Sequence, residues 1–228
     1  MKTIQYDGFE LDHFDSALNF RKYQISLITK FINGKFLEVG AGKGGLIPFY
    51  KNLIKNITII EPEKKLFKIL KKNYSTKRFS IKNQTINNIK RKYDTIIYYD
   101  VLEHIKNDLN EVKLASKRLN KNGYLIFSVP AYQNFYSSFD KSVGHFKRYN
   151  KKDFIVLGKR TGLKIEKLAY YDSLGFLFLV LNKLFSLKQT NLENKVYLWN
   201  LLMPISKLID LLTFNKFGKS LLCVFKKC

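Results

Sequence analysis

Cysteine is scarce in this sequence, and both cysteines lie at its far carboxyl end. Cys223 and Cys228 could close no more than a trivial loop, and no CxxC pair or Cys/His spacing suggests zinc. A disulfide framework and a cysteine-based zinc site are therefore excluded. We expect a reducing, cytoplasmic compartment and no bound metal.

Long hydrophobic runs are also lacking. The densest run, residues 174–181, is far shorter than the roughly 20 apolar residues that a spanning helix needs, and Asn182 and Lys183 interrupt it. Residues 1–15 carry acidic side chains and show no basic stretch followed by an apolar core, so we expect no signal peptide. Repeats, low-complexity tracts and linkers are missing too, which favours one domain over residues 1–228.

Acidic residues are few, with 18 Asp and Glu against 41 Lys and Arg and a formal net charge of +23. Such an excess is typical of proteins that meet nucleic acid or anionic membranes. The lysines are scattered, however, and form no single Arg-rich stripe interleaved with aromatic residues. Two interpretations stay open: solvated lysine-rich helix faces, or attraction to acidic polymers or to the inner membrane surface as a peripheral contact.

Apolar residues are abundant, at 46% of the chain, and they fall into alternating patterns that indicate a globular protein. Short runs rich in β-branched or aromatic residues predict strands at 36–39, 57–60, 79–81, 95–99, 124–129, 163–171 and 221–225. Between them we expect helices around 66–70, over 109–119 with Asn122 and Gly123 as its cap, and over 151–161 ending at Gly162. This alternation predicts an α/β fold with a mostly parallel sheet covered on both faces.

Two further segments flank or interrupt this alternation. An N-terminal helical segment is expected over residues 10–33, ending at Asn33-Gly34. An apolar helical insertion is expected over residues 173–216, before the last strand. This insertion either packs over the sheet or active site, or lies at a lipid interface.

The strongest functional signal is the segment 37–46, LEVGAGKGGL, a strand that runs into a glycine-rich turn and a helix. Its glycines satisfy the dinucleotide fingerprint G-x-G-x-x-G, which is weak support by itself. Glu38 would repel a pyrophosphate but could receive an ammonium group. Glu61, after the next strand, stands at the usual distance for an acid that binds ribose hydroxyls. We therefore expect a pocket for a ligand that carries both an amino acid and a ribose, and a nicotinamide dehydrogenase is disfavoured.

These motifs resemble those of the class I methyltransferases that depend on S-adenosylmethionine (SAM). The pattern Glu38-x-Gly40-x-Gly42-x-Gly44, followed by Glu61, is similar to the first two motifs of that family. Residues 93–105, YDTIIYYDVLEHI, resemble the fourth-strand motif of its small-molecule branch. Residues 119–124 stand in place of its leucine, proline and double-glycine turn.

Further segments resemble one subgroup. Residues 129–131, 139–140 and 144–149 are similar to a subgroup of bacterial glycan- and lipid-modifying methyltransferases. The resemblance covers residues 19–171 well and the remainder loosely. It implies a doubly wound seven-stranded sheet of order 3-2-1-4-5-7-6, with the last strand antiparallel and helices on both faces.

The resemblance also implies SAM as the cofactor and a set of residues around it. These cofactor-binding residues are Glu38, Gly40, Ala41, Gly42, Gly44, Glu61, Pro62, Asn83, Gln84, Thr85, Asp100 and Val101. Many members of the family place an acid near position 84 to bind adenine. Gln84 departs from this, although an amide oxygen also accepts hydrogen bonds.

Catalytic residues are harder to read, because methyl transfer needs a base only when the acceptor must lose a proton. His104 and His145 are the candidates, since histidine titrates near neutrality. Alternatively, Glu103 and His104 cap or orient the loop after the fourth strand, and His145 has a structural role in its own loop. The candidate substrate-binding residues are Asp140, Arg148 and Tyr149. Arg148 would either bind an acidic acceptor group or pair with Asp140.

The function that we expect is SAM-dependent methylation of a hydroxyl or carboxyl group, with an amine less favoured, on a small molecule, glycan or lipid-linked acceptor. One alternative is an RNA methyltransferase, which the charge favours, although no motif for base methylation is present. Another is a non-catalytic module of the same fold that binds a membrane surface.

Overall fold

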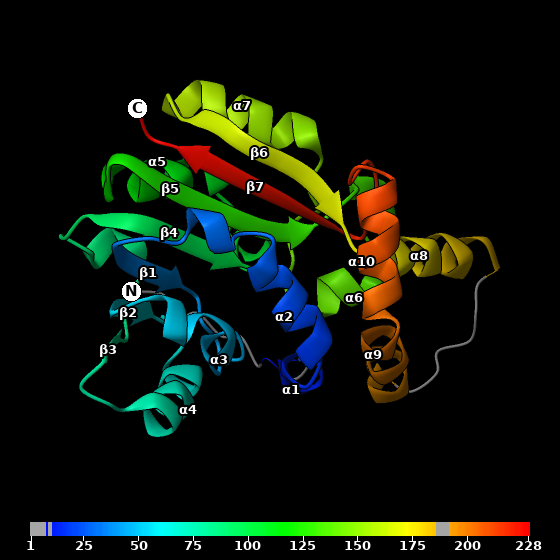
Figure 1. Ribbon diagram of the computed structural model, residues 1–228, viewed down its shortest axis with the longest axis horizontal. Helices are drawn as coiled ribbons and strands as arrows, with labels where there is room; N and C mark the ends of the chain where they lie inside the picture. The colour runs from blue at the N-terminus through cyan, green and yellow to red at the C-terminus, as the bar shows by residue number, and fades with distance from the viewer. Residues whose placement is uncertain (1–7, 9–10, 186–191) are drawn as a thin grey trace.

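A seven-stranded sheet forms the centre of the computed structural model, which describes residue 8, residues 11–185 and residues 192–228 (Figure 1). The strands are β1 (Lys35–Val39), β2 (Asn56–Ile60), β3 (Phe79–Lys82), β4 (Tyr93–Tyr99), β5 (Leu119–Pro130), β6 (Lys164–Tyr171) and β7 (Ser220–Lys226). Their order is β3-β2-β1-β4-β5-β7-β6, and β7 runs antiparallel to both of its neighbours. The predicted fold class and strand order are confirmed.

Helices cover both faces because successive strand residues point to opposite sides. In β1, Leu37 enters one hydrophobic core and Phe36 enters the other. The first core lies under α5 (Asp108–Lys117) and α7 (Lys151–Thr161), and the second lies under α2 (Leu18–Ser26), α3 (Ile47–Tyr50) and α4 (Lys64–Tyr74).

Two helix boundaries differ from the prediction. The leading helical segment is divided into α1 (Leu11–Asp15), α2 and the 3₁₀ turn η1 (Thr29–Phe31), because Ala17 leaves the helical region at φ −78° and ψ 67°. Residue 10 of the predicted segment lies outside the described residues. The helix expected to reach residue 119 ends at Lys117, because Leu119 is buried in the core and pairs with Tyr93 on β4.

The insertion before β7 folds as α8 (Ser173–Phe185), α9 (Leu192–Leu201) and α10 (Met203–Leu212), and residues 186–191 within it lie outside the described part. These helices gather beyond the carboxyl ends of the parallel strands (Figure 1). Trp199 of α9 packs on Phe20 of α2, with ring centroids 4.3 Å apart. The insertion leaves Leu211 and Leu212 at the end of α10, and Phe214 directly after it, exposed. Among the described helices, none is long and apolar enough to span a membrane.

Asp210 of α10 ties the insertion to the rest of the protein. Its buried carboxylate accepts hydrogen bonds from the Tyr23 hydroxyl at 2.7 Å, from the Asp172 N–H at 2.7 Å and from the Ser173 N–H at 2.9 Å. The side chain therefore joins α2, the end of β6 and the start of α8.

We expect Asp210→Asn to lower the free energy of unfolding by about 1 to 2 kcal/mol, because one acceptor becomes an amide donor that faces other donors. Urea unfolding followed by circular dichroism measures this, with Glu166→Gln on the exposed side of β6 as control. Equal stability of the two variants would mean that Asp210 does not anchor α10.

Candidate active site

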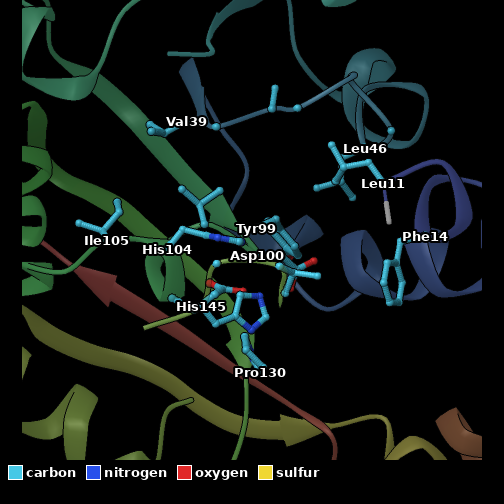
Figure 2. A pocket seen from close by; sticks show the side chains of 18 of the residues that line it. Leu11, Phe14, Val39, Leu46, Tyr99, Asp100, His104, Ile105, Pro130 and His145 are labelled. Carbon is cyan, nitrogen blue, oxygen red and sulfur yellow. The ribbon is translucent and has the colours of Figure 1, made fainter. Parts of the chain in front are cut away.

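A cavity of about 870 Å³ opens at the carboxyl ends of β1, β2, β4 and β5 (Figure 2). This volume is in the range of sites that bind drug-sized ligands. Parallel strands of such sheets place their ligands at this edge. Leu11 and Phe14 of α1 cover one side, and Leu179 and Trp199 of the insertion add to the wall. The cavity thus brings together segments from both ends of the chain.

The turn after β1 presents bare main chain to this cavity. Gly40 has φ +70°, and a Cβ there would lie 2.7 Å from Val101 Cγ2. Gly42 has φ +58°, and its Cβ would meet Leu11. Only glycine suits both positions, because the backbone conformation and the close neighbours exclude a side chain. A ligand can therefore lie directly against the main chain, which is what the nucleoside and amino acid of SAM require.

Other members of the predicted turn are placed differently. Ala41 and Gly45 both line the cavity. Gly44 has φ +92° and lies against Tyr74 and Leu70. It fits the turn onto α4 and is not among the residues that line the cavity.

Glu61, directly after β2, is a buried carboxylate at the cavity wall, with 4% of its surface exposed. Its Oε2 accepts from the Gly42 N–H at 2.8 Å and its Oε1 accepts from the Glu63 N–H at 2.9 Å. Burial raises the pKa of Glu61 to about 7, although these two N–H groups lower it. Each carboxylate oxygen keeps a second lone pair, so the group can also accept from ribose hydroxyls.

Glu38, at the end of β1, is also buried and lines the cavity. Burial raises its pKa to about 7, and the hydrogen bond donated by the Tyr50 hydroxyl opposes this rise. A buried acid of this kind gains most from a cationic partner.

Asp100, after β4, holds a left-handed conformation at φ +55° and lines the cavity together with Val101. Arg21 of α2 reaches it at 3.4 Å and also pairs with Asp15 at 3.1 Å. Arg21 is buried beside the cavity and was missed by the sequence analysis. The available signal was its place one helical turn after Ala17 and two turns before Ile28, on the buried face of the segment.

Only some of the residues that were predicted to bind near adenine line the cavity. Pro62 and Thr85 line the cavity. Asn83 instead donates to the main-chain carbonyls of Glu61 and Pro62, at 2.8 and 2.9 Å, which braces the end of β2. Gln84 is not among the lining residues.

Two histidines meet at the opposite side of the cavity. His104 ends the 3₁₀ turn η4 (Leu102–His104), and its ring centroid lies 4.7 Å from that of His145. Burial, and then the neighbouring His145, lower the pKa of His104 to about 4, so this ring is neutral at pH 7. Next to it, burial and the charge of Asp100 raise the pKa of Glu103 well above its usual value.

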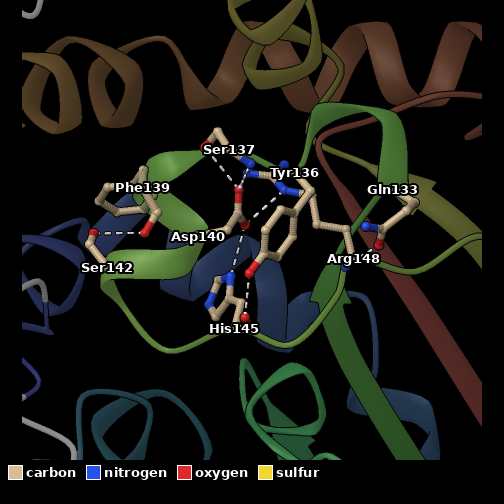
Figure 3. A network of polar contacts seen from close by, with 8 residues as sticks. All are labelled: Gln133, Tyr136, Ser137, Phe139, Asp140, Ser142, His145 and Arg148. Atoms are coloured by element: carbon tan, nitrogen blue, oxygen red, sulfur yellow. Dashed lines mark hydrogen bonds and ion pairs between the residues drawn. The ribbon is translucent and has the colours of Figure 1, made fainter.

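Asp140, in α6 (Ser138–Ser142), organises the loop that carries His145 (Figure 3). It accepts from His145 Nδ1 and from Arg148 Nε, both at 2.8 Å, and from the Ser137 N–H at 2.9 Å. Burial raises the pKa of Asp140, but the hydrogen bonds from His145 and Arg148 lower it by more, so that it lies below its usual range. Asp140 is therefore ionised and orients the imidazole.

The three predicted substrate-binding residues take different places. Arg148 lines the cavity and also forms the ion pair with Asp140 that the sequence left as its alternative. Asp140 and Tyr149 are fully buried and are not among the lining residues. The Tyr149 hydroxyl lies 3.2 Å from the Leu102 carbonyl and 3.2 Å from the Asp108 carboxylate. Neither residue therefore offers a direct contact to a ligand in this cavity.

Comparisons with known proteins agree with this geometry. Residues 12–168 match the model of a family described as a methyltransferase domain. None of the curated proteins searched matches the sequence significantly.

Solved methyltransferases share the fold. One match is a chain of the complex between the Haloferax volcanii Trm112 methyltransferase activator and a methyltransferase, at 10% identity and TM-score 0.67, covering 98% of each chain. Another is an S-adenosylmethionine-dependent methyltransferase from Clostridium acetobutylicum, at 13% identity and TM-score 0.61, covering 96% of each chain. A third is the N-methyltransferase NodS of Bradyrhizobium japonicum with bound S-adenosyl-L-homocysteine, at 12% identity and TM-score 0.59, covering 99% of this chain and 94% of that one. The chain belongs to the methyltransferase domain family, and it is an enzyme that uses S-adenosylmethionine.

Proposed function

We propose that this methyltransferase acts on a hydroxyl or carboxyl oxygen of a small molecule, glycan or glycolipid, as in the glycan- and lipid-modifying branch that its motifs resemble. The observation that carries the proposal is the pair His145 and Asp140, in which Asp140 orients an imidazole that lines the same cavity as the glycine turn. An oxygen acceptor that must lose a proton needs such a base. An amine acceptor remains less favoured.

At the cofactor end, the main chain of Gly40 and Gly42 would lie against SAM, and Glu61 would accept from its ribose hydroxyls. Glu38 would receive the ammonium group, and Asp100 and Val101 would border the methionine part. When bound, SAM supplies a methyl group on a positively charged sulfur. Thr85 and Pro62, which line the cavity, would hold the adenine.

At the acceptor end, Asp140 accepts the Nδ1 proton of His145, which leaves the lone pair of the neutral ring on Nε2. His145 is then able to take the proton that an acceptor hydroxyl loses. Arg148 offers the rest of its guanidinium to an acidic group of the acceptor. His104, which is neutral, borders the same space.

The cover over the cavity is apolar. Leu11 and Phe14 of α1 and Trp199 of α9 border it. Exclusion of water there strengthens the interactions of the glutamates with a cationic ligand. We therefore propose that the N-terminal helices and the insertion form one catalytic domain with the sheet.

The cofactor affinity should depend on pH through Glu61. Because the folded-state pKa of Glu61 is about 7, above its ordinary value of 4.5, a proton must leave before the carboxylate can accept from both ribose hydroxyls. We expect the Kd for SAM to decrease by up to about tenfold between pH 6 and pH 8, and Glu61→Gln to flatten this dependence.

Calorimetric titration in buffers of different ionisation enthalpy measures the change and the proton released. A wild-type Kd that is constant over this range would show that Glu61 is already ionised or not in contact with the cofactor. Without ligand, the raised pKa of Glu61 stabilises the fold fully below pH 4.5, because the folded chain holds this proton more tightly than the unfolded chain does. The contribution falls as the pH rises from 4.5 to about 7 and is absent above that pH.

The acceptor class is tested by incubating the enzyme with SAM labelled in its methyl group and a cell extract, then separating small molecules, lipid, polysaccharide, RNA and protein. The proposal expects label in the lipid, polysaccharide or small-molecule fraction, and a large decrease with His145→Ala. Label in protein or RNA would contradict it.

The charge of +23 favours one second candidate, a methyltransferase that acts on RNA. Binding of RNA through phosphate contacts falls steeply with salt. A steep salt dependence of RNA binding, together with label in RNA, would support this candidate over an oxygen acceptor on a glycan or lipid.

A further inference from the structure

Three metal-ligating side chains converge at the acceptor end of the cavity. Glu103 and His104 follow β4, and His145 comes from the loop after α6. One ligand atom from each of them lies within 4.8 Å of the other two. Figure 2 shows His104 and His145 next to each other beside Asp100. All three residues of the cluster line the cavity, so a bound ion would face the acceptor.

Glu103 is the unexplained member of the cluster. Only 1% of its surface is exposed, and neither carboxylate oxygen has a hydrogen-bond partner among the described residues. A buried carboxyl group without partners is costly. Glu103 also lines the cavity, so its unpartnered carboxyl group can be reached by a ligand that enters there.

Both imidazoles are held by contacts that leave them suited to a metal. Asp140 binds His145 Nδ1 at 2.8 Å, and the main chain of Gly144 hydrogen-bonds with His104. A carboxylate or carbonyl behind a histidine is the usual support of a metal ligand, because it fixes the ring and its tautomer. The Asp140 carboxylate is itself held by Arg148 and Ser137.

We propose that Glu103, His104 and His145 bind one divalent transition-metal ion, of the zinc, manganese or iron(II) class, at the acceptor end of the cavity. Two imidazoles and one carboxylate suit these ions, whereas magnesium and calcium prefer oxygen ligands alone. Ligand atoms at about 2.1 Å from a shared ion lie at most about 4.2 Å apart. Small side-chain rotations from the present 4.8 Å bound complete the site.

Three protein ligands leave coordination positions open toward the cavity. In a step that rests on the proposed function, an acceptor oxygen takes one of them, and the ion lowers the pKa of that hydroxyl so that its proton passes to water. His145 then serves as a ligand in place of acting as the base, since its single free lone pair cannot do both. The sequence analysis expected no metal because no CxxC pair or Cys/His spacing is present. The fold brings His145 to Glu103 and His104 from far along the chain.

The test uses the full chain, freed of metal with a chelator and titrated with Co²⁺ while the visible absorption is recorded. We expect one Co²⁺ per chain, with the ligand-field bands of a low-coordinate ion, and displacement by Zn²⁺. Glu103→Gln and His145→Ala should each weaken Co²⁺ binding at least tenfold, and Glu166→Gln should bind as the wild type does. The proposal would be overturned if the wild type did not bind Co²⁺, or if Glu103→Gln and His145→Ala bound it as tightly as the wild type does.

Two further measurements separate this inference from other failures. The thermal unfolding midpoint without metal shows that Glu103→Gln is folded. We expect Zn²⁺ to raise the midpoint of the wild type and not that of this variant. Equal rises in the two proteins would overturn the proposed metal site. SAM titration of the same samples addresses the proposed function independently. Metal binding without label transfer to an oxygen acceptor would support the metal site and contradict the proposed function. An equal rate of label transfer with and without metal would show that the ion has no role in the reaction.

Discussion

His145→Ala is expected to lower kcat at least about 100-fold while the Kd for SAM changes less than about twofold. The expectation follows from position: His145 lies in the cavity wall with its ring oriented by Asp140, and none of its hydrogen bonds involves the glycine turn or Glu61. Loss of an oriented base, or of a metal ligand, removes a contribution of 100-fold or more to the chemical step. Single-turnover kinetics with labelled SAM, together with calorimetry, measure the two quantities.

The matched control is Ser142→Ala in the same loop. Ser142 is exposed, hydrogen-bonds only locally to the Phe139 carbonyl and is not among the residues that line the cavity. This variant should keep the wild-type kcat. A parallel loss of cofactor binding in His145→Ala would move His145 into the cofactor site and contradict its assignment to the acceptor end.

The second large effect concerns Glu61. We expect Glu61→Ala to weaken SAM binding by about 3 kcal/mol, or more than about 100-fold in Kd, because two hydrogen bonds to a charged carboxylate are lost. The cavity and the glycine turn remain, so binding should weaken and not change site. Calorimetric titration measures the loss, with Glu166→Ala as the exposed control.

Glu61 also has a structural role that the experiment must separate. Its oxygens accept from the N–H groups of Gly42 and Glu63, so the variant leaves both donors without this partner. The unfolding midpoint of Glu61→Ala, measured first, sets a temperature at which the protein is folded. An unchanged Kd at that temperature would remove Glu61 from the cofactor site.

The sheet was predictable because its signals are local. The β-branched run of β2 and the glycine turn after β1 each identify their own conformation, and the alternation of strands and helices indicates a parallel sheet. Boundaries were less predictable where burial decides them. Leu119 continues a helical pattern in sequence, yet it begins β5 because its side chain fills the core beside Tyr93.

Some residues of the candidate site were also predictable from local signals, whereas others were not. Glu38 lies near the end of β1 and Glu61 directly follows the adjacent strand β2, so their approach to one cavity follows from parallel pairing. Arg21 and Glu103 were missed because their proximity to the cavity depends on how α2 and η4 pack. Asp140 stood out in sequence as a ligand contact, but the structure buries it behind His145, and no pattern of neighbouring residues reveals that depth.

The central claim is that the glycine turn and the two buried glutamates hold SAM, and a crystal structure of the protein with this cofactor tests it most directly. The account predicts the ribose hydroxyls within hydrogen-bond distance of Glu61, the amino-acid end beside Glu38, and the methyl group directed toward His145. Density for the cofactor outside this cavity, or a cavity filled by protein side chains in crystals grown with saturating SAM, would contradict it.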